Sequence, residues 1–134
     1  MTFASPENAA VLALDIGATK LAVGVVAADG RVITQTRRPT PRQSDQAIAC
    51  LLEMGLEMRT RSAGEGARLV AAGIACGGPL DLERGLVLSP PNLPGWDEVP
   101  ISDLVAHEYG LPVFLQKDAA AGALATCFWA VSYT

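Results

Sequence analysis

Short apolar runs separated by turn residues dominate the start of the chain. Residues 9–14 form an apolar run that ends at Asp15, residues 20–26 form a second run, and residues 31–37 alternate between apolar and polar side chains. Such runs predict strands, and the Asp29-Gly30 pair favours a tight turn between the last two. Because short turns join consecutive strands side by side, we expect three antiparallel neighbours.

A helical pattern follows these strands. Apolar residues recur at helical spacing over residues 44–61, and Ser44 is the expected N-cap residue. Gly55 should weaken this helix, because glycine costs a helix interior about 1 kcal/mol relative to alanine. Residues 62–66, SAGEG, predict a loop after it.

The remaining pattern predicts further strands and helices in alternation. Expected strands cover residues 69–75, 86–88 and 111–116, and expected helices cover residues 102–109 and a stretch from 118 towards 129. Residues 89–95, SPPNLPG, predict a rigid irregular loop. The order β-β-β-α-β-(β)-α-β-α predicts an α/β domain with a mixed sheet flanked by helices. We expect residues 1–134 to form a single domain.

Composition and charge exclude several classes of function. The chain is 50% hydrophobic with a formal net charge of -4, and no basic stripe suggests nucleic acid binding. Arg37, Arg38 and Arg42 are interpreted as a solvated strand end. No run approaches the roughly 20 apolar residues that cross a bilayer. Three widely spaced cysteines suit a reducing cytoplasm, so we expect a cytoplasmic protein without a membrane partner.

The turn between the first two strands is the first candidate site. Gly17 allows a close backbone approach to a phosphate, successive N–H groups in such a turn bind anions, and Thr19 and Lys20 add a hydroxyl and a positive charge. Asp15 at the strand end offers an oxygen ligand to Mg²⁺. The alternative is an ordinary hairpin turn with solvated side chains.

Two further candidates lie later in the chain. Asp118 follows a strand and begins a helix, so it fits both a general base and a helix N-cap. The loops at residues 77–81 and 91–96 offer Asn92 as a donor and acceptor for a polar ligand. Trp96 either stacks on a sugar or fills the edge of the core. His107, the only histidine, is interpreted as a surface residue, and no zinc-binding cluster is visible.

Together these motifs resemble the ROK family of repressors and sugar kinases. Residues 11–20, VLALDIGATK, resemble its first phosphate motif, and residues 73–81, GIACGGPLD, resemble its stretch ending in Gly-Pro-Val-Asp. Residues 89–96, SPPNLPGW, resemble its Ala-Pro-Asn-Leu-Pro-Gly-Trp loop. Residues 110–114 and Asp118 resemble the strand and turn that carry its catalytic aspartate. The four matches occur in the family's order.

The resemblance implies an actin-like ATPase (ribonuclease H-like) fold and ATP-dependent phosphorylation of a hexose. Asp118 would then be the general base, and the phosphate and Mg²⁺ side would be lined by Asp15, Gly17, Thr19 and Lys20. Gly78, Asn92 and Lys117 would hold the sugar. The implied ligands are a hexose, ATP and Mg²⁺, without zinc in this chain, and a homo-oligomer is left open.

The chain departs from the family pattern in three places. Lys117 replaces an asparagine that binds the sugar; lysine donates but does not accept hydrogen bonds, and its charge would lower the pKa of Asp118. Ala120 replaces a second asparagine, and residues 126–134 do not resemble the family.

The family's second lobe, with its zinc site and adenosine pocket, is not seen in the sequence. We therefore expect an N-terminal lobe, truncated and inactive alone. The alternative is a non-catalytic sugar-binding or regulatory module of the family. A DNA-binding repressor is disfavoured, because too few residues precede the first strand for a helix-turn-helix.

Overall fold

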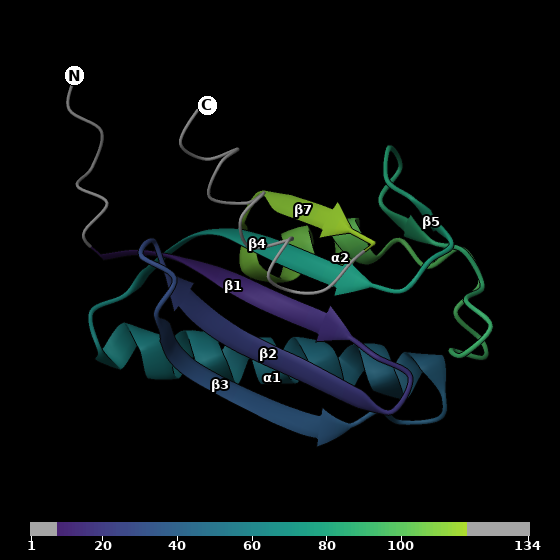
Figure 1. The fold of residues 1–134 in the computed structure, drawn as a ribbon, viewed down its shortest axis with the longest axis horizontal. Helices are drawn as coiled ribbons and strands as arrows, with labels where there is room; N and C mark the ends of the chain where they lie inside the picture. The colour runs from purple at the N-terminus through teal and green to yellow at the C-terminus, as the bar shows by residue number, and fades with distance from the viewer. Residues whose placement is uncertain (1–7, 118–134) are drawn as a thin grey trace.

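The structure is a computed structural model that describes residues 8–117. A five-stranded mixed sheet with the order β3-β2-β1-β4-β7 forms its centre (Figure 1). Its strands are β1 (Ala9–Ile16), β2 (Lys20–Ala27), β3 (Val32–Pro39), β4 (Arg68–Cys76) and β7 (Val113–Gln116). The first three strands are antiparallel neighbours, as expected, and β4 and β7 add in parallel to β1. The expected mixed sheet is confirmed.

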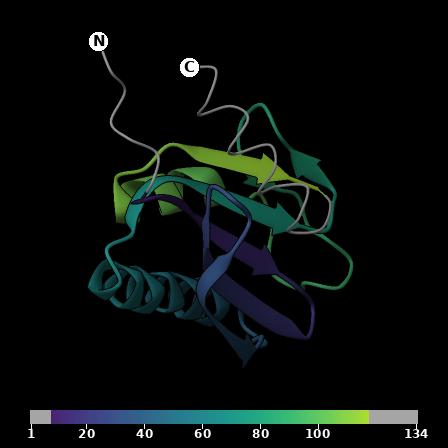
Figure 2. The same cartoon turned by 60° about the vertical axis from the view of Figure 1, so that its left-hand side comes forward.

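Two helices cover one face of the sheet, α1 (Ser44–Gly64) and α2 (Ile101–Tyr109) (Figures 1 and 2). α1 runs behind β1, β2 and β3, whereas α2 packs against β4 and β7. α2 is capped at its C-terminus by Gly110, whose φ of 65° is the left-handed conformation that glycine accepts readily. A small second sheet pairs β5 (Leu80–Asp81) with β6 (Leu86–Val87).

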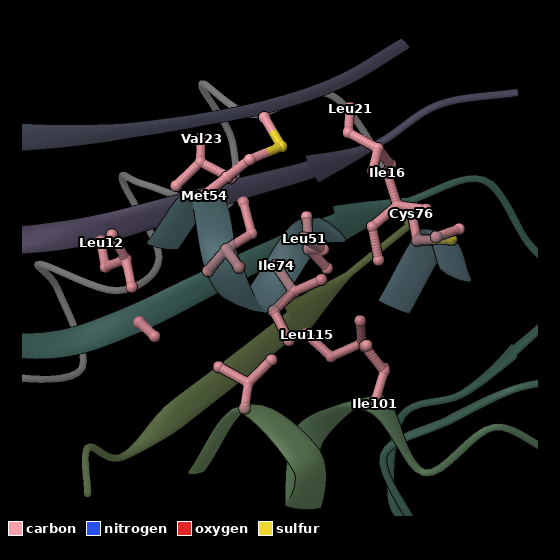
Figure 3. Close-up of a cluster of buried hydrophobic side chains, with 14 of the residues drawn as sticks. Leu12, Ile16, Leu21, Val23, Leu51, Met54, Ile74, Cys76, Ile101 and Leu115 are labelled. Atoms are coloured by element: carbon pink, nitrogen blue, oxygen red, sulfur yellow. The ribbon is translucent and has the colours of Figure 1, made fainter. Parts of the chain in front are cut away.

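The main core fills the space between the sheet and the two helices. Alternation along β1 and β2 sends Leu12 and Val23 towards α1, where they meet Met54 (Figure 3). Ile101 of α2 and Leu115 of β7 extend the same core on the other side. Trp96 is 1% exposed and belongs to this core, which supports the packing interpretation of its side chain over sugar stacking.

Two sequence-based expectations are wrong. Ser44 is not the N-cap of α1, because the cap position is occupied by Gln43 and no side chain there makes a capping hydrogen bond. The helix also continues to Gly64 through most of the expected 62–66 loop. The strand β5 was not expected, because two residues carry no alternation to detect. The expected helix from Asp118 onward lies outside the described residues.

Candidate functional site

The parallel strands bring the predicted motifs to one edge of the sheet. Ile16 at the end of β1 lies opposite Cys76 at the end of β4, and Ala75 lies opposite Gln116 at the end of β7. Gly17, Gly77 and Lys117 therefore follow three strands that end side by side. Ligands of open α/β sheets gather at this carboxyl edge.

A cavity of about 180 Å³ lies at that edge between three segments. It is lined by Gly17 and Ala18 of the β1–β2 turn, by Gly77 and Gly78, and by Asn92 of the 89–96 loop. Residues more than 70 positions apart in the sequence thus share one hollow. Of the predicted site residues, Gly17, Gly78 and Asn92 are brought together here.

The β1–β2 turn is tight and is held by a residue that sequence reasoning missed. The Gly17 N–H donates to the Lys20 carbonyl at 3.1 Å, and a Cβ on Gly17 would lie 2.7 Å from that same oxygen. The Thr40 hydroxyl donates to the Gly17 carbonyl at 2.8 Å, while the Thr40 N–H donates to the Thr19 carbonyl at 3.0 Å. Thr40 follows β3, so only the tertiary fold reveals that it positions this turn.

The 89–96 loop is braced from within and from its neighbours. The Ser89 N–H donates to the Trp96 carbonyl at 2.8 Å, and the side chains of Leu93 and Trp96 anchor the loop in the core. Leu88 N–H donates to the Pro79 carbonyl at 3.0 Å, which ties this loop to the Gly77–Pro79 segment. The exposed Asn92 is therefore carried on a fixed backbone.

Asp15 lies on the opposite face of the sheet from the two helices. It is half-buried beside Ala22 and lines a separate shallow cavity of about 190 Å³ together with Arg37. Burial raises the pKa of the Asp15 carboxyl, and the Arg37 charge opposes that rise. Among residues 8–117, no donor hydrogen-bonds to this carboxylate. Its oxygens are not buried, so they are open to solvent and to a hydrated Mg²⁺.

The other predicted residues are placed less directly. Lys20 starts β2, and strand alternation puts it on the same face as Asp15; Thr19 is exposed in the turn. The Lys117 side chain lies against Gly78, at the border of the 180 Å³ cavity. Asp118, the predicted general base, is outside the described residues. His107 is exposed, as expected.

The part of the chain that the structure describes has neither a metal-binding cluster nor a membrane-spanning helix. No group of three histidine, cysteine or acidic side chains is arranged to hold a metal within residues 8–117. Neither helix in that range is long and apolar enough to cross a membrane.

Two curated relatives with similar sequences are sugar kinases by name. The glucokinase of Thermotoga maritima is 36% identical over 113 residues, which cover 83% of this chain and 34% of that protein. The N-acetylmannosamine kinase of Yersinia pestis is 36% identical over 114 residues, which cover 85% of this chain and 37% of that protein. The chain thus spans about a third of the length of these curated relatives.

Solved structures show the same fold. A ROK family glucokinase from Streptomyces griseus, in complex with glucose and AMPPNP, superposes with a TM-score of 0.70 at 33% identity, covering 85% of this chain and 35% of that one. The ROK hexokinase of Thermus thermophilus gives a TM-score of 0.69 at 33% identity, covering 80% of this chain and 34% of that one. The fold is therefore that of the actin-like ATPases.

The sequence model of the ROK family matches residues 11–134, which is most of the chain. This match includes all four motifs that carry the resemblance, and the two relatives above are both sugar kinases by name. The chain belongs to the ROK family.

Proposed function

We propose that residues 1–134 form the N-terminal lobe of an ATP-dependent hexose kinase of the glucokinase type. The observation that carries the proposal is the single cavity that unites Gly17, Gly78 and Asn92 at the carboxyl edge of the sheet. It joins a turn suited to phosphate with two segments suited to a sugar, as in-line transfer between the two requires.

The residues have distinct roles in this proposal. Asp118 takes the proton of the attacking sugar hydroxyl as its oxygen bonds to the γ-phosphorus, and the bond to the β-phosphate oxygen breaks to release ADP. Because the Gly17 N–H already donates to the Lys20 carbonyl, the turn binds the phosphates through the N–H groups of Ala18 and Thr19 and through the Thr19 and Lys20 side chains. Asp15 would hold Mg²⁺, which supplies charge neutralisation at the phosphates. Gly78, Asn92 and Lys117 orient the sugar.

Binding of glucose tests the sugar side of the proposal. The chain has only two asparagines, and Asn8 lines a hollow with Glu65 and Gly66 at the other end of the sheet. Calorimetry should show that Asn92→Ala weakens glucose binding by about tenfold, whereas Asn8→Ala leaves it unchanged; tenfold corresponds to one lost hydrogen bond of about 1.4 kcal/mol. Equal glucose affinities of Asn92→Ala, Asn8→Ala and the wild type would contradict the proposed role of Asn92 in sugar binding.

Catalysis by this chain alone is expected to be negligible. Phosphoryl transfer needs a closed, water-free cleft, and one lobe offers only one wall of such a cleft. A coupled ADP-release assay with glucose and Mg-ATP should therefore show no turnover above background. Robust glucose-dependent ADP release by residues 1–134 would overturn the assignment as an isolated lobe. We expect the protein to work in the cytoplasm.

The second candidate is a non-catalytic sugar-binding or regulatory module, and the position of Lys117 favours it. Its side chain borders the sugar cavity through Gly78, and an ammonium group donates hydrogen bonds without accepting any. In this case glucose binds without transfer, and Lys117→Asn strengthens binding by restoring an acceptor.

A further inference from the structure

A second cavity lies beside the proposed sugar cavity and has about twice its volume, roughly 360 Å³ against 180 Å³. Six of its lining residues matter here: Ala18, Thr40, Arg42, Asn92, Leu93 and Trp96. Ala18, Asn92 and Leu93 line both cavities, so the two hollows meet at these residues. A volume of this size is in the range of small-molecule pockets.

Arg42 gives this second cavity its charge. Within residues 8–117 its guanidinium pairs with no carboxylate, whereas Arg38 and Arg61 share Glu57 and Arg84 pairs with Asp81. None of the residues that line the cavity is acidic. The nearest acid along the chain is Asp45, and its carboxylate accepts the N–H of Gln46 at 2.9 Å. The planar guanidinium is the group best suited to bind phosphate or carboxylate with two hydrogen bonds.

The rest of the lining suits a small polar molecule. The Asn92 amide can donate to a ligand, while the Thr40 hydroxyl already donates to Gly17 and keeps only acceptor capacity. Leu93 and Trp96, which are 5% and 1% exposed, support the cavity from the core side. The positive end of α1 begins two residues after Arg42 and lacks a side-chain cap, which adds a favourable potential for an anion.

We propose that this second cavity binds an anionic group, a phosphate or a carboxylate, that is carried by the sugar in the neighbouring cavity. Hexose phosphates and uronic acids should then bind more tightly than the neutral hexose glucose. The inference rests on the proposed function, because it assumes that the first cavity holds a sugar ring.

The test compares glucose, glucose 6-phosphate, glucuronate and inorganic phosphate as ligands of the full 134-residue chain. Calorimetry should give about tenfold tighter binding for both anionic sugars than for glucose, in line with one charge-assisted hydrogen-bonded pair. Arg42→Gln should abolish this preference and leave glucose affinity unchanged. The matched control is Arg31→Gln, since Arg31 is also exposed but lines the hollow at the far end of the sheet.

The outcomes separate the two proposals. Equal binding of glucose and the anionic sugars, or an Arg42→Gln variant that keeps the preference, overturns the anion cavity and leaves the hexose proposal standing. Phosphate binding that depends on Arg42 without any glucose binding supports the anion cavity as such and contradicts the hexose site. If only glucose 6-phosphate gains affinity, phosphate is the anion; if glucuronate gains equally, any anion suffices.

Discussion

The side chain of Lys117 lies across the α-carbon of Gly78. A Cβ added to Gly78 would sit 2.9 Å from Cε and 3.3 Å from Cδ of Lys117. The end of β7 and the loop after β4 are therefore in contact at the border of the proposed sugar cavity, although 38 residues separate them in the sequence. Gly78 leaves room for the Lys117 side chain, and any larger residue at this position would disturb that contact.

Replacing Gly78 by alanine should displace Lys117 and weaken glucose binding severalfold. The clash involves the far end of a flexible side chain, so the free energy of unfolding should change by less than about 0.5 kcal/mol. A double-mutant cycle provides the control: in a Lys117→Ala background, Gly78→Ala should have no further effect on glucose affinity. The same loss in both backgrounds would show that Lys117 does not transmit the effect.

Thr40 should hold the β1–β2 turn, the proposed phosphate site, in place without contacting phosphate itself. Thr40→Val removes the hydroxyl bond to the Gly17 carbonyl and should cost about 1 kcal/mol of folding stability and weaken AMPPNP binding. Thr60→Val is the matched control, since the Thr60 hydroxyl only bonds the Leu56 carbonyl of its own helix. Urea unfolding and nucleotide titration measure the two effects. Unchanged nucleotide affinity in Thr40→Val would refute the positioning role.

Asp15 should reduce folding stability at neutral pH. Because burial raises the folded-state pKa above its ordinary value of 3.8, the folded chain binds this proton more tightly than the unfolded chain does. The resulting stabilisation is present below pH 3.8 and is lost as pH rises through the folded-state pKa. Asp15→Asn has no such charge to bury, so it should be more stable than the wild type at pH 7.

Denaturation of Asp15→Asn and the wild type between pH 7 and pH 4 checks this sign. The stability difference should shrink as pH falls, because the wild-type carboxyl becomes neutral. Glu53→Gln, at an exposed position of α1, is the control for the loss of a carboxylate as such. A stability difference that stays constant between pH 7 and pH 4 would contradict the claim that burial of the charged Asp15 carboxylate costs stability.

Gly55 should be irreplaceable despite its position inside a helix. A Cβ there would overlap the Tyr109 hydroxyl and lie 2.6 Å from Cζ of that ring, whose hydroxyl donates to the Leu52 carbonyl at 2.7 Å. Gly55→Ala should therefore destabilise the chain by about 1–3 kcal/mol through overpacking. Gly64→Ala in the same helix meets nothing within 4 Å and should stabilise it by up to about 1 kcal/mol. Thermal unfolding of both variants decides between packing and helix propensity.

The sequence predicted the sheet well, because its strands have strong local signals. The apolar runs of β1 and β4 and the Asp29-Gly30 turn identified the strands and the antiparallel start. Gly55 was interpreted only as a weak point of α1, because its contact with Tyr109 depends on how two helices pack. The N-cap was misplaced at Ser44 because the actual cap, Gln43, uses its backbone carbonyl and no side chain.

The candidate site was predictable in part. Gly17, Gly78 and Asn92 stood out through motifs. The meeting of Gly17 and Gly78 follows from the parallel strands β1 and β4, which end together, whereas the 89–96 loop carries Asn92 to the same cavity. Thr40 and Arg42 were not predicted as site residues, because a threonine and an arginine after a strand carry no local signal. Only the fold brings them beside the β1–β2 turn and Asn92.

The most direct test of the central claim is paramagnetic broadening of backbone amide signals by Mn-AMPPNP, with glucose present. If Asp15 holds the metal and the turn after it binds phosphate, the amides of Gly17, Gly78 and Asp118 should all broaden. Asn8 should stay sharp, because β1 separates it from the turn by eight residues at about 3.3 Å each. Broadening at Asn8, or a sharp Asp118 signal beside a broadened Gly17, would contradict a shared kinase site at this edge of the sheet.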